Sequence, residues 1–347
     1  MKFDERSREK TLTDKLEQIK VEFSVYRSNT KRTIAFIREL NKKIDHSKPN
    51  FIIFIGYHYP AAAWLFINRF SKKLPYAVRL GGDPIEVPWK RLKNSKKHLK
   101  LNTNAQFLGL ARHLFNKIFI RSIDTVIVVT KCLAQQDMFS KKRVFVMPPS
   151  ITISDKAKLQ YKLPAPPRKV KLLCVSNLNY YEKYLGIVEI IDSLNHIDTR
   201  QNFTLKILGG GDYLPMLRNR IKESIANYQI EVDGYQNDTS AYYQQADIFI
   251  YSSTLDAWPN VLMEAMAHGL PIVCNYNDSF SEVFSEAQRD FLYDPMGLET
   301  LEKDLQKLMS NSDFAAMRSQ LSLDRIKSIN NNLINTSELE AWLHKVR

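Results

Sequence analysis

The sequence predicts an α/β protein made of two doubly wound domains, each with a parallel sheet, and a cleft between them. Three observations predict this class. The chain has 347 residues, which exceeds what one hydrophobic core usually accommodates. Its β-rich runs are short and continuously apolar, as expected of strands that are buried on both faces. These runs alternate with helical segments in two successive sets, which is typical of paired parallel sheets.

The first set of elements occupies the first 150 residues. The segment "AAAWLFINRFSKK" (61–73) is expected to be helical, and a long basic stretch after residue 82 carries apolar residues at helical spacing. Those apolar residues are Phe107, Leu110, Ala111, Leu114 and Ile118. Strands are expected in the β-rich runs at 50–56, 75–82, 124–130 and 143–150.

The second set repeats the pattern after a proline-rich segment. "YKLPAPPRKVK" (161–171) is rich in proline and bases and lacks apolar periodicity, so a linker is expected there. The strands expected beyond it are 171–177, 204–211, 230–235, 247–253 and 271–275. We therefore divide the chain into a first domain (1–160), a linker (161–170), a second domain (171–330) and a helical tail (331–347).

Composition favours a globular protein of the cytoplasm. Hydrophobic residues make up 44% of the chain and aromatic residues 11%, which is enough for real cores. The longest apolar run, 51–67, is broken by polar and helix-breaking residues and is too short to span a bilayer. The first residues, "MKFDERSREK", lack the apolar core of a secretory signal. Cys132, Cys174 and Cys274 show neither disulfide nor zinc spacing, so we expect them to be buried as small hydrophobic residues.

The net charge of +13 is concentrated in the first half. Residues 1–150 hold 30 Lys and Arg against 12 Asp and Glu, whereas residues 151–347 hold 20 against 25. Between Val87 and Ile123, nine bases meet no acidic residue. Such a field favours an anionic partner. The sequence shows no nucleic-acid reader motif and no basic–aromatic stacking platform, so nucleic acid is not expected to be that partner.

The segment "WPNVLMEAMAHGLPIV" (258–273) contains one charged residue, Glu264, in an otherwise apolar helix. Pro259 is compatible with the first helical turn, and Gly269 with Pro271 marks the end of the helix. A carboxylate among buried apolar residues costs several kcal/mol, by rough transfer estimates, unless hydrogen-bond donors satisfy it. Sugar hydroxyls are suitable donors. The alternative is a glutamate that points out through a gap in a buried helix.

The residues around this helix extend the same pattern. Asp256 lies eight positions before Glu264, in the loop that leads into the helix. Asn260 and Val261, at the helix start, offer backbone N–H groups to an anion. One short segment therefore has the groups to bind a sugar, a diphosphate and a ribose in sequence.

These motifs resemble the family 4 retaining glycosyltransferases, which have the GT-B fold. "SSTLDAWPNVLMEAMAHGLPIVCN" resembles the family signature of two acidic residues separated by seven others, a run of small residues and Gly-Leu-Pro. "VDGYQNDTSAYYQQADIFIYSS", "LKILGGGDYLPMLRNRI" and "LLCVSNLNYYEKYLGIVEII" resemble the strands, turns and helices that precede it. The likeness covers nearly all of residues 50–300, and it is specific in the second domain and loose in the first.

The resemblance implies a role for each matching residue. Glu264 would bind the ribose of the nucleotide, and Asp256 would meet hydroxyls of the transferred sugar. Asn260 and Val261 would present backbone N–H groups to the diphosphate. Lys183 would neutralise the leaving diphosphate. The sequence has no Asp-x-Asp pair, so we expect no metal and no cofactor, with the UDP- or GDP-linked sugar as a substrate.

The sequence departs from the family pattern in the second domain. Asp256 stands where the family usually has glutamate and reaches roughly 1.5 Å less far. Asn177 stands where an arginine usually accompanies the lysine, so the diphosphate site lacks one positive charge. Arg79 could supply it from across the cleft, or it is a solvated base at a strand end. Gly81 and Gly82 after it allow close approach of the backbone to the donor, although a turn alone explains them.

The first domain departs further. Residues 1–23 contain no glycine and no clear first strand, where the family normally has a strand and a glycine-rich loop. The family's histidine near the reacting carbon is absent from the matching strand end, so His58 is a substitute candidate for a catalytic role, with a structural histidine as the alternative.

The implied function is metal-independent transfer of a hexose, with retention, from a nucleotide-diphosphate donor to a glycan or lipid-linked acceptor. Such enzymes serve bacterial surface polysaccharide synthesis, as in capsule or lipopolysaccharide. The basic segment Trp89–Lys100 is expected to lie on an anionic membrane, which places the enzyme peripherally on the inner face of the cell membrane. Two alternatives remain: a non-catalytic GT-B subunit that stabilises or positions an active partner, and a nucleotide-sugar epimerase.

Overall fold

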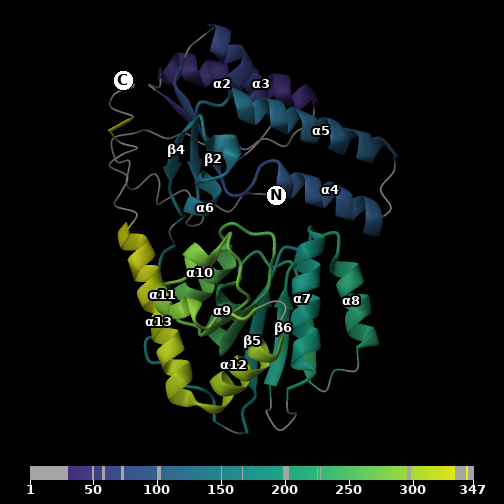
Figure 1. Cartoon of the computed structure of the whole chain (residues 1–347), viewed down its shortest axis with the longest axis vertical. Helices are drawn as coiled ribbons and strands as arrows, with labels where there is room; N and C mark the ends of the chain where they lie inside the picture. The colour runs from purple at the N-terminus through teal and green to yellow at the C-terminus, as the bar shows by residue number, and fades with distance from the viewer. Residues whose placement is uncertain are drawn as a thin grey trace. The chain divides into compact units, whose positions relative to one another are not determined.

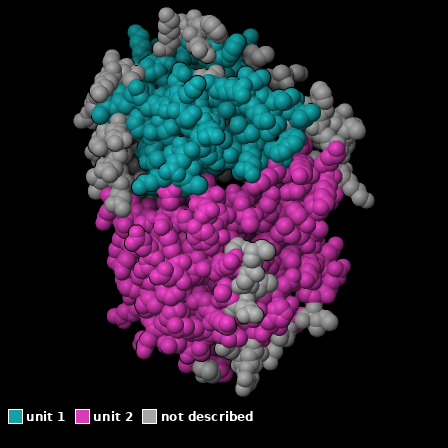
Figure 2. Space-filling view, viewed as in Figure 1, with its two compact units in different colours: residues 1–89, 103–150, 332–347 teal, residues 90–102, 151–331 magenta. Residues whose placement is uncertain are grey.

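The computed structural model shows two compact units, each with its own parallel sheet (Figures 1 and 2). The structure describes residues 30–48, 51–56, 59–71, 74–99, 103–149, 151–165, 167–197, 203–224, 226, 228–294, 298–332 and 341–342. Unit 1 comprises residues 1–89, 103–150 and 332–347, and unit 2 comprises residues 90–102 and 151–331.

The sheet of unit 1 has four parallel strands among the described residues, in the order β1-β2-β3-β4. They are β1 (Ile52–Ile55), β2 (Tyr76–Leu80), β3 (Thr125–Val128) and β4 (Arg143–Val146). Every residue of β3 is buried, because this central strand has a neighbour on each side and is covered on both faces. Each expected β-rich run of the first half contains one of these strands, so that prediction is confirmed.

The helices of unit 1 pack apolar side chains against this sheet. The buried ring of Trp64 lies 5.6 Å from the ring of Phe54 on β1, and its indole nitrogen donates a hydrogen bond to Asn41. This contact joins α3 to both β1 and α2. The helical elements with residues in this unit are α2 (Thr30–Ser47), α3 (Tyr59–Ser71), α4 (Glu86–His98), α5 (Thr103–Ser122), α6 (Lys131–Ala134) and η1 (Asp137–Phe139).

The sheet of unit 2 has five parallel strands in the order β7-β6-β5-β8-β9. They are β5 (Val170–Val175), β6 (Phe203–Leu208), β7 (Gln229–Gly234), β8 (Ile248–Tyr251) and β9 (Ile272–Cys274). All five match the β-rich runs expected in the second half. Cys174 and Cys274 are buried within these strands, as expected, whereas Cys132 of unit 1 is only half-buried.

The helices of unit 2 alternate with its strands, as the sequence predicts. They are α7 (Tyr181–Leu194), α8 (Leu214–Glu223), α9 (Ser240–Gln245), α10 (Asn260–Ala267), η2 (Ser281–Val283), α11 (Glu286–Arg289), α12 (Leu298–Ser310) and α13 (Ser312–Asn332). Among the described residues, no helix is both long enough and apolar enough to cross a membrane.

The expected linker, 161–170, lies within unit 2, since the chain passes between the units at residues 150 and 151. Tyr161 is buried in the unit 2 core and donates a hydrogen bond to the backbone oxygen of Asp247. The buried Asp247 carboxylate accepts hydrogen bonds from Arg168 and from the backbone N–H of Lys171. These contacts fasten the proline-rich segment to the unit. One aromatic anchor and one buried acid therefore make the expected linker part of a packed surface.

Helix α4 belongs to both units, because residues 86–89 lie in unit 1 and residues 90–98 in unit 2. On unit 2, Asn94 donates a hydrogen bond to Glu182, and the His98 ring stacks on the Tyr181 ring at 3.8 Å. The segment Trp89–Lys100 therefore contains residues that pack on protein, while Lys93, Lys96 and Lys97 are exposed.

The end of the chain returns to unit 1. Trp342 is buried against Phe145 on β4, with ring centroids 5.6 Å apart, and belongs to a cluster with Ala77, Ile127 and Met147. The expected tail, 331–347, thus contributes to the core of unit 1, although most of it lies outside the described residues.

Candidate active site

The strand order of unit 2 defines where a ligand site is expected. From β5 the chain proceeds to β6 and β7 on one side of the sheet, and β8 and β9 lie on the other side. The order therefore reverses between β5 and β8. In open parallel sheets, ligands bind beyond the carboxyl ends of the strands at this reversal. Lys183 follows β5, and Asp256 and Glu264 follow β8, so the three predicted residues flank this point.

Gly186 positions Lys183 over the end of β8. A Cβ atom at Gly186 would lie 2.2 Å from the backbone oxygen of Ser252, the residue that follows β8. Helix α7 thus packs against this strand end at a distance that only glycine permits. Lys183 is one helical turn earlier, so the close packing brings its side chain next to Tyr251, the last residue of β8.

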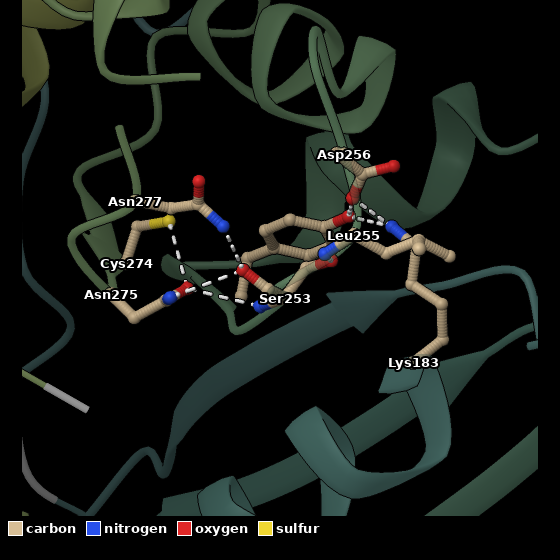
Figure 3. Close-up of polar contacts among 8 residues, drawn as sticks. Lys183, Ser253, Leu255, Asp256, Cys274, Asn275 and Asn277 are labelled. Atoms are coloured by element: carbon tan, nitrogen blue, oxygen red, sulfur yellow. Dashed lines mark hydrogen bonds and ion pairs between the residues drawn. The ribbon is translucent and has the colours of Figure 1, made fainter. Parts of the chain in front are cut away.

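Lys183, Tyr251 and Asp256 form a three-way polar cluster. Figure 3 labels two of its members, Lys183 and Asp256. The Lys183 ammonium group donates to the Tyr251 hydroxyl and to Oδ2 of Asp256, and the Tyr251 hydroxyl donates to the same carboxylate oxygen. The Lys183 nitrogen also lies 4.9 Å from the centre of the Tyr251 ring, a cation–π contact. The structure therefore brings the predicted Lys183 and Asp256 together and adds Tyr251, which the sequence argument missed.

The cluster is shielded from water and keeps Asp256 ionised. The Lys183 side chain is 7% exposed and the Asp256 side chain 23%. Burial opposes ionisation of Asp256, but attraction to Lys183 and hydrogen bonds from Lys183, Tyr251 and Ser253 outweigh it, so the pKa of Asp256 is lowered. Burial and the neighbouring Asp256 charge raise the pKa of Tyr251 well above its usual value, so its hydroxyl stays a hydrogen-bond donor.

The loop that carries Asp256 is held by a second group of hydrogen bonds (Figure 3). Asn275 accepts from the backbone N–H of Ser253 at 3.0 Å and donates to the Ser253 backbone oxygen at 3.1 Å. Asn277 donates to that same oxygen at 3.1 Å. The Ser253 hydroxyl accepts from the backbone N–H of Leu255 at 3.2 Å. The start of the loop is thereby fixed before the chain reaches Asp256.

Helix α10 has the burial that its sequence predicts, with Leu262, Met263, Ala265, Met266 and Ala267 all buried. It begins at Asn260, with Pro259 as its N-cap and no side chain capping its first turn, and Gly269 adopts a positive φ of 69° just after its end. Glu264 is half-buried on this helix.

Tyr243 binds the Glu264 carboxylate. Its buried hydroxyl donates to Oε2 of Glu264 at 2.9 Å, and burial together with the Glu264 charge raises the pKa of Tyr243 well above its usual value. The Tyr243 ring stacks on His268, whose Nδ1 lies 2.7 Å from the Glu264 backbone oxygen and must donate, because a carbonyl only accepts. Burial lowers the pKa of His268, which favours its neutral ring. The Glu264 carboxylate is therefore held by a buried tyrosine.

Asn177 and the turn of residues 209–211 follow the carboxyl ends of β5 and β6. Asn177 follows β5, and its side-chain oxygen accepts from the backbone and side-chain nitrogens of Asn179 at 3.1 and 2.7 Å. It thus stabilises the turn before α7. Gly209 and Gly211 have positive φ, and a Cβ at Gly209 would lie 1.9 Å from the Ser176 backbone oxygen. The two turns pack against each other as closely as backbones allow.

The remaining predicted residues belong to unit 1. Arg79 is half-buried near the carboxyl end of β2, in register with Ile55 and Ile127. Gly81 and Gly82 follow β2, and a Cβ at either would meet no atom within 4 Å, so packing does not require glycine there. His58 lies outside the described residues. Across the described ranges, no group of three or more His, Cys, Asp or Glu side chains is arranged to hold a metal ion.

Two parallel-sheet units, one with polar residues at its strand reversal, define this chain as a protein of the GT-B fold, which confirms the predicted fold class. Residues 155–322, nearly all of unit 2, match the family model described as "Glycosyl transferases group 1".

The chain is also similar to two glycosyltransferase relatives and to a solved structure. An uncharacterized glycosyltransferase of Haemophilus influenzae is 24% identical over 216 residues, which cover 61% of this chain and 59% of that protein. An alpha-monoglucosyldiacylglycerol synthase of Streptococcus pneumoniae is 26% identical over 152 residues, 42% of this chain and 33% of that protein.

A Staphylococcus aureus TarM variant, solved with Fondaparinux, alpha-GlcNAc-glycerol and UDP, superposes with a TM-score of 0.64. Its sequence is 15% identical, and the match covers 88% of this chain and 59% of that one. The chain therefore spans less than two thirds of the length of these proteins.

Proposed function

We propose that the protein is a glycosyltransferase that uses a nucleotide-diphosphate sugar as its donor. The observation that carries this proposal is the pairing of Lys183 with Asp256 at the strand reversal of unit 2, with Glu264 on the adjoining helix. A cation, an ionised carboxylate and a second carboxylate are the groups that a diphosphate, a sugar and a ribose need. The bond from the anomeric carbon to the diphosphate breaks, and a bond to an acceptor oxygen forms.

Each residue has a proposed role. Lys183 stabilises the negative charge that develops on the leaving diphosphate, which is the main electrostatic task of such a transfer. The start of α10 at Asn260 and Val261 offers backbone N–H groups to the same anion. Asp256 binds hydroxyls of the transferred sugar, and Glu264, supported by Tyr243, binds the ribose. Arg79, Gly81 and Gly82 are further proposed donor-binding residues, and His58 is a proposed catalytic residue.

Retention at the anomeric carbon and independence of metal ions are further parts of the proposal. Retention rests on the likeness of the Asp256–Glu264 segment to the retaining family. Metal independence is supported by Lys183, a buried cation that can balance the diphosphate charge in place of a metal ion. The proposed donor is a UDP- or GDP-linked sugar, and the similar TarM variant was solved with UDP.

We propose a glycan or lipid-linked acceptor at an anionic membrane, with the protein peripheral on the inner face of the cell membrane. Leu110, Leu114 and Ile118 lie four residues apart on α5 and are 45%, 53% and 68% exposed. The exposed bases Lys117 and Arg121 lie on the same helix. An exposed apolar stripe beside bases suits an interfacial helix. A synthase of a glycosylated diacylglycerol among the relatives supports a lipid-linked acceptor, and capsule or lipopolysaccharide synthesis is the proposed setting.

The alternative is a non-catalytic GT-B subunit that stabilises or positions an active partner. The observation that favours it is the state of Asn177, whose amide is engaged within its own turn and adds no charge to a diphosphate site.

A thermal-shift panel of UDP, GDP and their sugars tests the proposed function. We expect one nucleotide to raise the melting temperature of the wild type and Glu264→Ala to abolish that rise, because the ribose loses its carboxylate partner. Glu223→Ala, an exposed glutamate at the end of α8, is the matched control and should respond like the wild type. An unchanged response of Glu264→Ala would remove its ribose role, and no response to any nucleotide would favour the non-catalytic subunit.

A further inference from the structure

The ammonium group of Lys183 is already neutralised within the protein. Its hydrogen bonds go to the Tyr251 hydroxyl and to the Asp256 carboxylate, and its side chain is 7% exposed. An ammonium group that is withdrawn from water to this degree needs an anionic partner. Asp256 is that partner in this structure. A diphosphate that arrives at Lys183 therefore meets a cation that a carboxylate already holds.

The two partners of Lys183 differ in how firmly they are fixed. Tyr251 is 1% exposed, and its ring packs against Phe249 at 6.3 Å and against Phe280 at 6.5 Å. Asp256 lies on the loop between β8 and α10, and its side chain is 23% exposed. Tyr251 is therefore held by the core, whereas Asp256 is the partner that an incoming ligand can reach.

We propose that Asp256 is an internal competitor of the donor: its carboxylate occupies Lys183 until the diphosphate takes its place. This proposal rests on the proposed function for its biological meaning. Lys183 keeps the hydrogen bond to Tyr251 throughout and exchanges Asp256 for a phosphate oxygen. Asp256, released from its ion pair, then becomes free to accept hydrogen bonds from the sugar. Recognition of the diphosphate and of the sugar is thereby coupled through one lysine.

If Asp256 competes with the donor, removing its charge should increase the affinity of the site for anions. Asp256→Asn keeps a side-chain oxygen that accepts from Lys183 but removes the competing charge. The attraction between the Lys183 ammonium group and an incoming anion is then stronger, because no neighbouring carboxylate neutralises Lys183 or repels the anion. An inorganic diphosphate should bind more tightly to Asp256→Asn than to the wild type. Coupling between two binding events in a protein typically changes affinity by about 5- to 150-fold, so a gain of at least about fivefold is expected.

The experiment is calorimetric titration of the full chain with sodium pyrophosphate, without divalent cations. Asp324→Asn is the matched control, because Asp324 is an exposed aspartate that also pairs with a lysine, Lys327, on α13. The pyrophosphate affinity of this variant should equal that of the wild type. Lys183→Met should lose binding. Asp256→Ser is the second variant, and circular dichroism checks that each variant is folded.

Tighter binding of pyrophosphate by Asp256→Asn or Asp256→Ser, with the control unchanged, supports the proposal. Equal or weaker binding by both variants overturns it, and so does the absence of binding to every variant. UDP, GDP and their sugars are titrated in parallel. Tighter pyrophosphate binding without any binding of nucleotides would support the competition at Lys183 and contradict the proposed function, so the two failures are distinguishable.

Discussion

At the scale of single residues, the site consists of two carboxylates, each supported by a buried tyrosine. Tyr251 donates to Asp256, and Tyr243 donates to Glu264. Each hydroxyl stays protonated because burial and the adjacent carboxylate raise its pKa. Tyrosine suits this task, since a rigid ring packs in the core and only the hydroxyl reaches the acid. The two acids are therefore oriented before any ligand arrives.

Tyr243→Phe should weaken nucleotide binding by at least about tenfold, because a hydrogen bond to a charged group contributes about 1.5–3 kcal/mol and about 1.4 kcal/mol corresponds to tenfold. Titration calorimetry with the nucleotide found in the thermal-shift panel measures the change. Tyr228→Phe is the control, since its hydroxyl bonds the backbone oxygen of Ile191 at 3.1 Å instead of a carboxylate. Equal affinities of the two variants would show that Tyr243 does not position Glu264.

Glu189 predicts a pH-dependent stability. Burial raises its pKa above the ordinary 4.5, although a hydrogen bond from Ser252 partly offsets this. A carboxyl with a raised folded pKa destabilises the fold while it is ionised, and this penalty disappears as the pH falls through the raised pKa towards 4.5. Glu189→Gln should therefore melt at a higher temperature than the wild type at pH 7.5 and at the same temperature near pH 4. A constant difference across this range would refute the explanation.

At the scale of elements, one close contact between α7 and the end of β8 determines the geometry of the site. Lys183 and Tyr251 come from these two elements, and Gly186 sets their separation. The sequence shows this glycine three residues after the lysine, but glycine in a helix is ordinarily a weak signal. Only the position of the Ser252 backbone reveals why a larger residue is excluded.

Gly186→Ala should destabilise the protein by about 1–3 kcal/mol, since its Cβ would overlap the Ser252 oxygen at 2.2 Å. This cost outweighs the gain of up to about 1 kcal/mol that alanine normally brings to a helix. Urea unfolding followed by circular dichroism measures it. Gly81→Ala is the comparison, because its Cβ would meet nothing within 4 Å and should leave the unfolding midpoint nearly unchanged. Similar midpoints for both variants would argue against the close contact.

At the scale of the whole molecule, the sequence predicted the strands of both units and the two acidic residues near the strand reversal. Short, continuously apolar runs indicate buried strands, and a lone acid in an apolar helix is conspicuous. Tyr251 was missed because it ends an apolar strand, where a core aromatic is the ordinary explanation. Tyr243 was missed because nothing in its short helix, SAYYQQ, distinguishes it from the neighbouring Tyr242. The domain boundaries differ from expectation because segments 90–102 and 161–170 belong to unit 2. Each segment contacts the unit through only a few side chains, which produce no periodic pattern in the sequence.

The basic half of the chain predicts binding to anionic membranes. Ile118→Glu places a charge in the exposed stripe of α5 and should reduce co-sedimentation with vesicles that contain phosphatidylglycerol. Leu159→Glu is the matched control, because Leu159 has the same exposed fraction of 68% but lies in unit 2. Equal loss in both variants, or equal binding of the wild type to neutral and anionic vesicles at low salt, would contradict the membrane proposal.

The most direct test of the central claim is donor turnover in the presence of EDTA, measured as release of nucleotide diphosphate from UDP- and GDP-linked sugars. The wild type should release diphosphate from one donor, and Lys183→Met should do so at least about 100-fold more slowly, because it lacks the cation that stabilises the leaving group. Undiminished turnover by Lys183→Met, or no turnover of any donor that the wild type binds, would contradict the assignment of a glycosyltransferase site to unit 2.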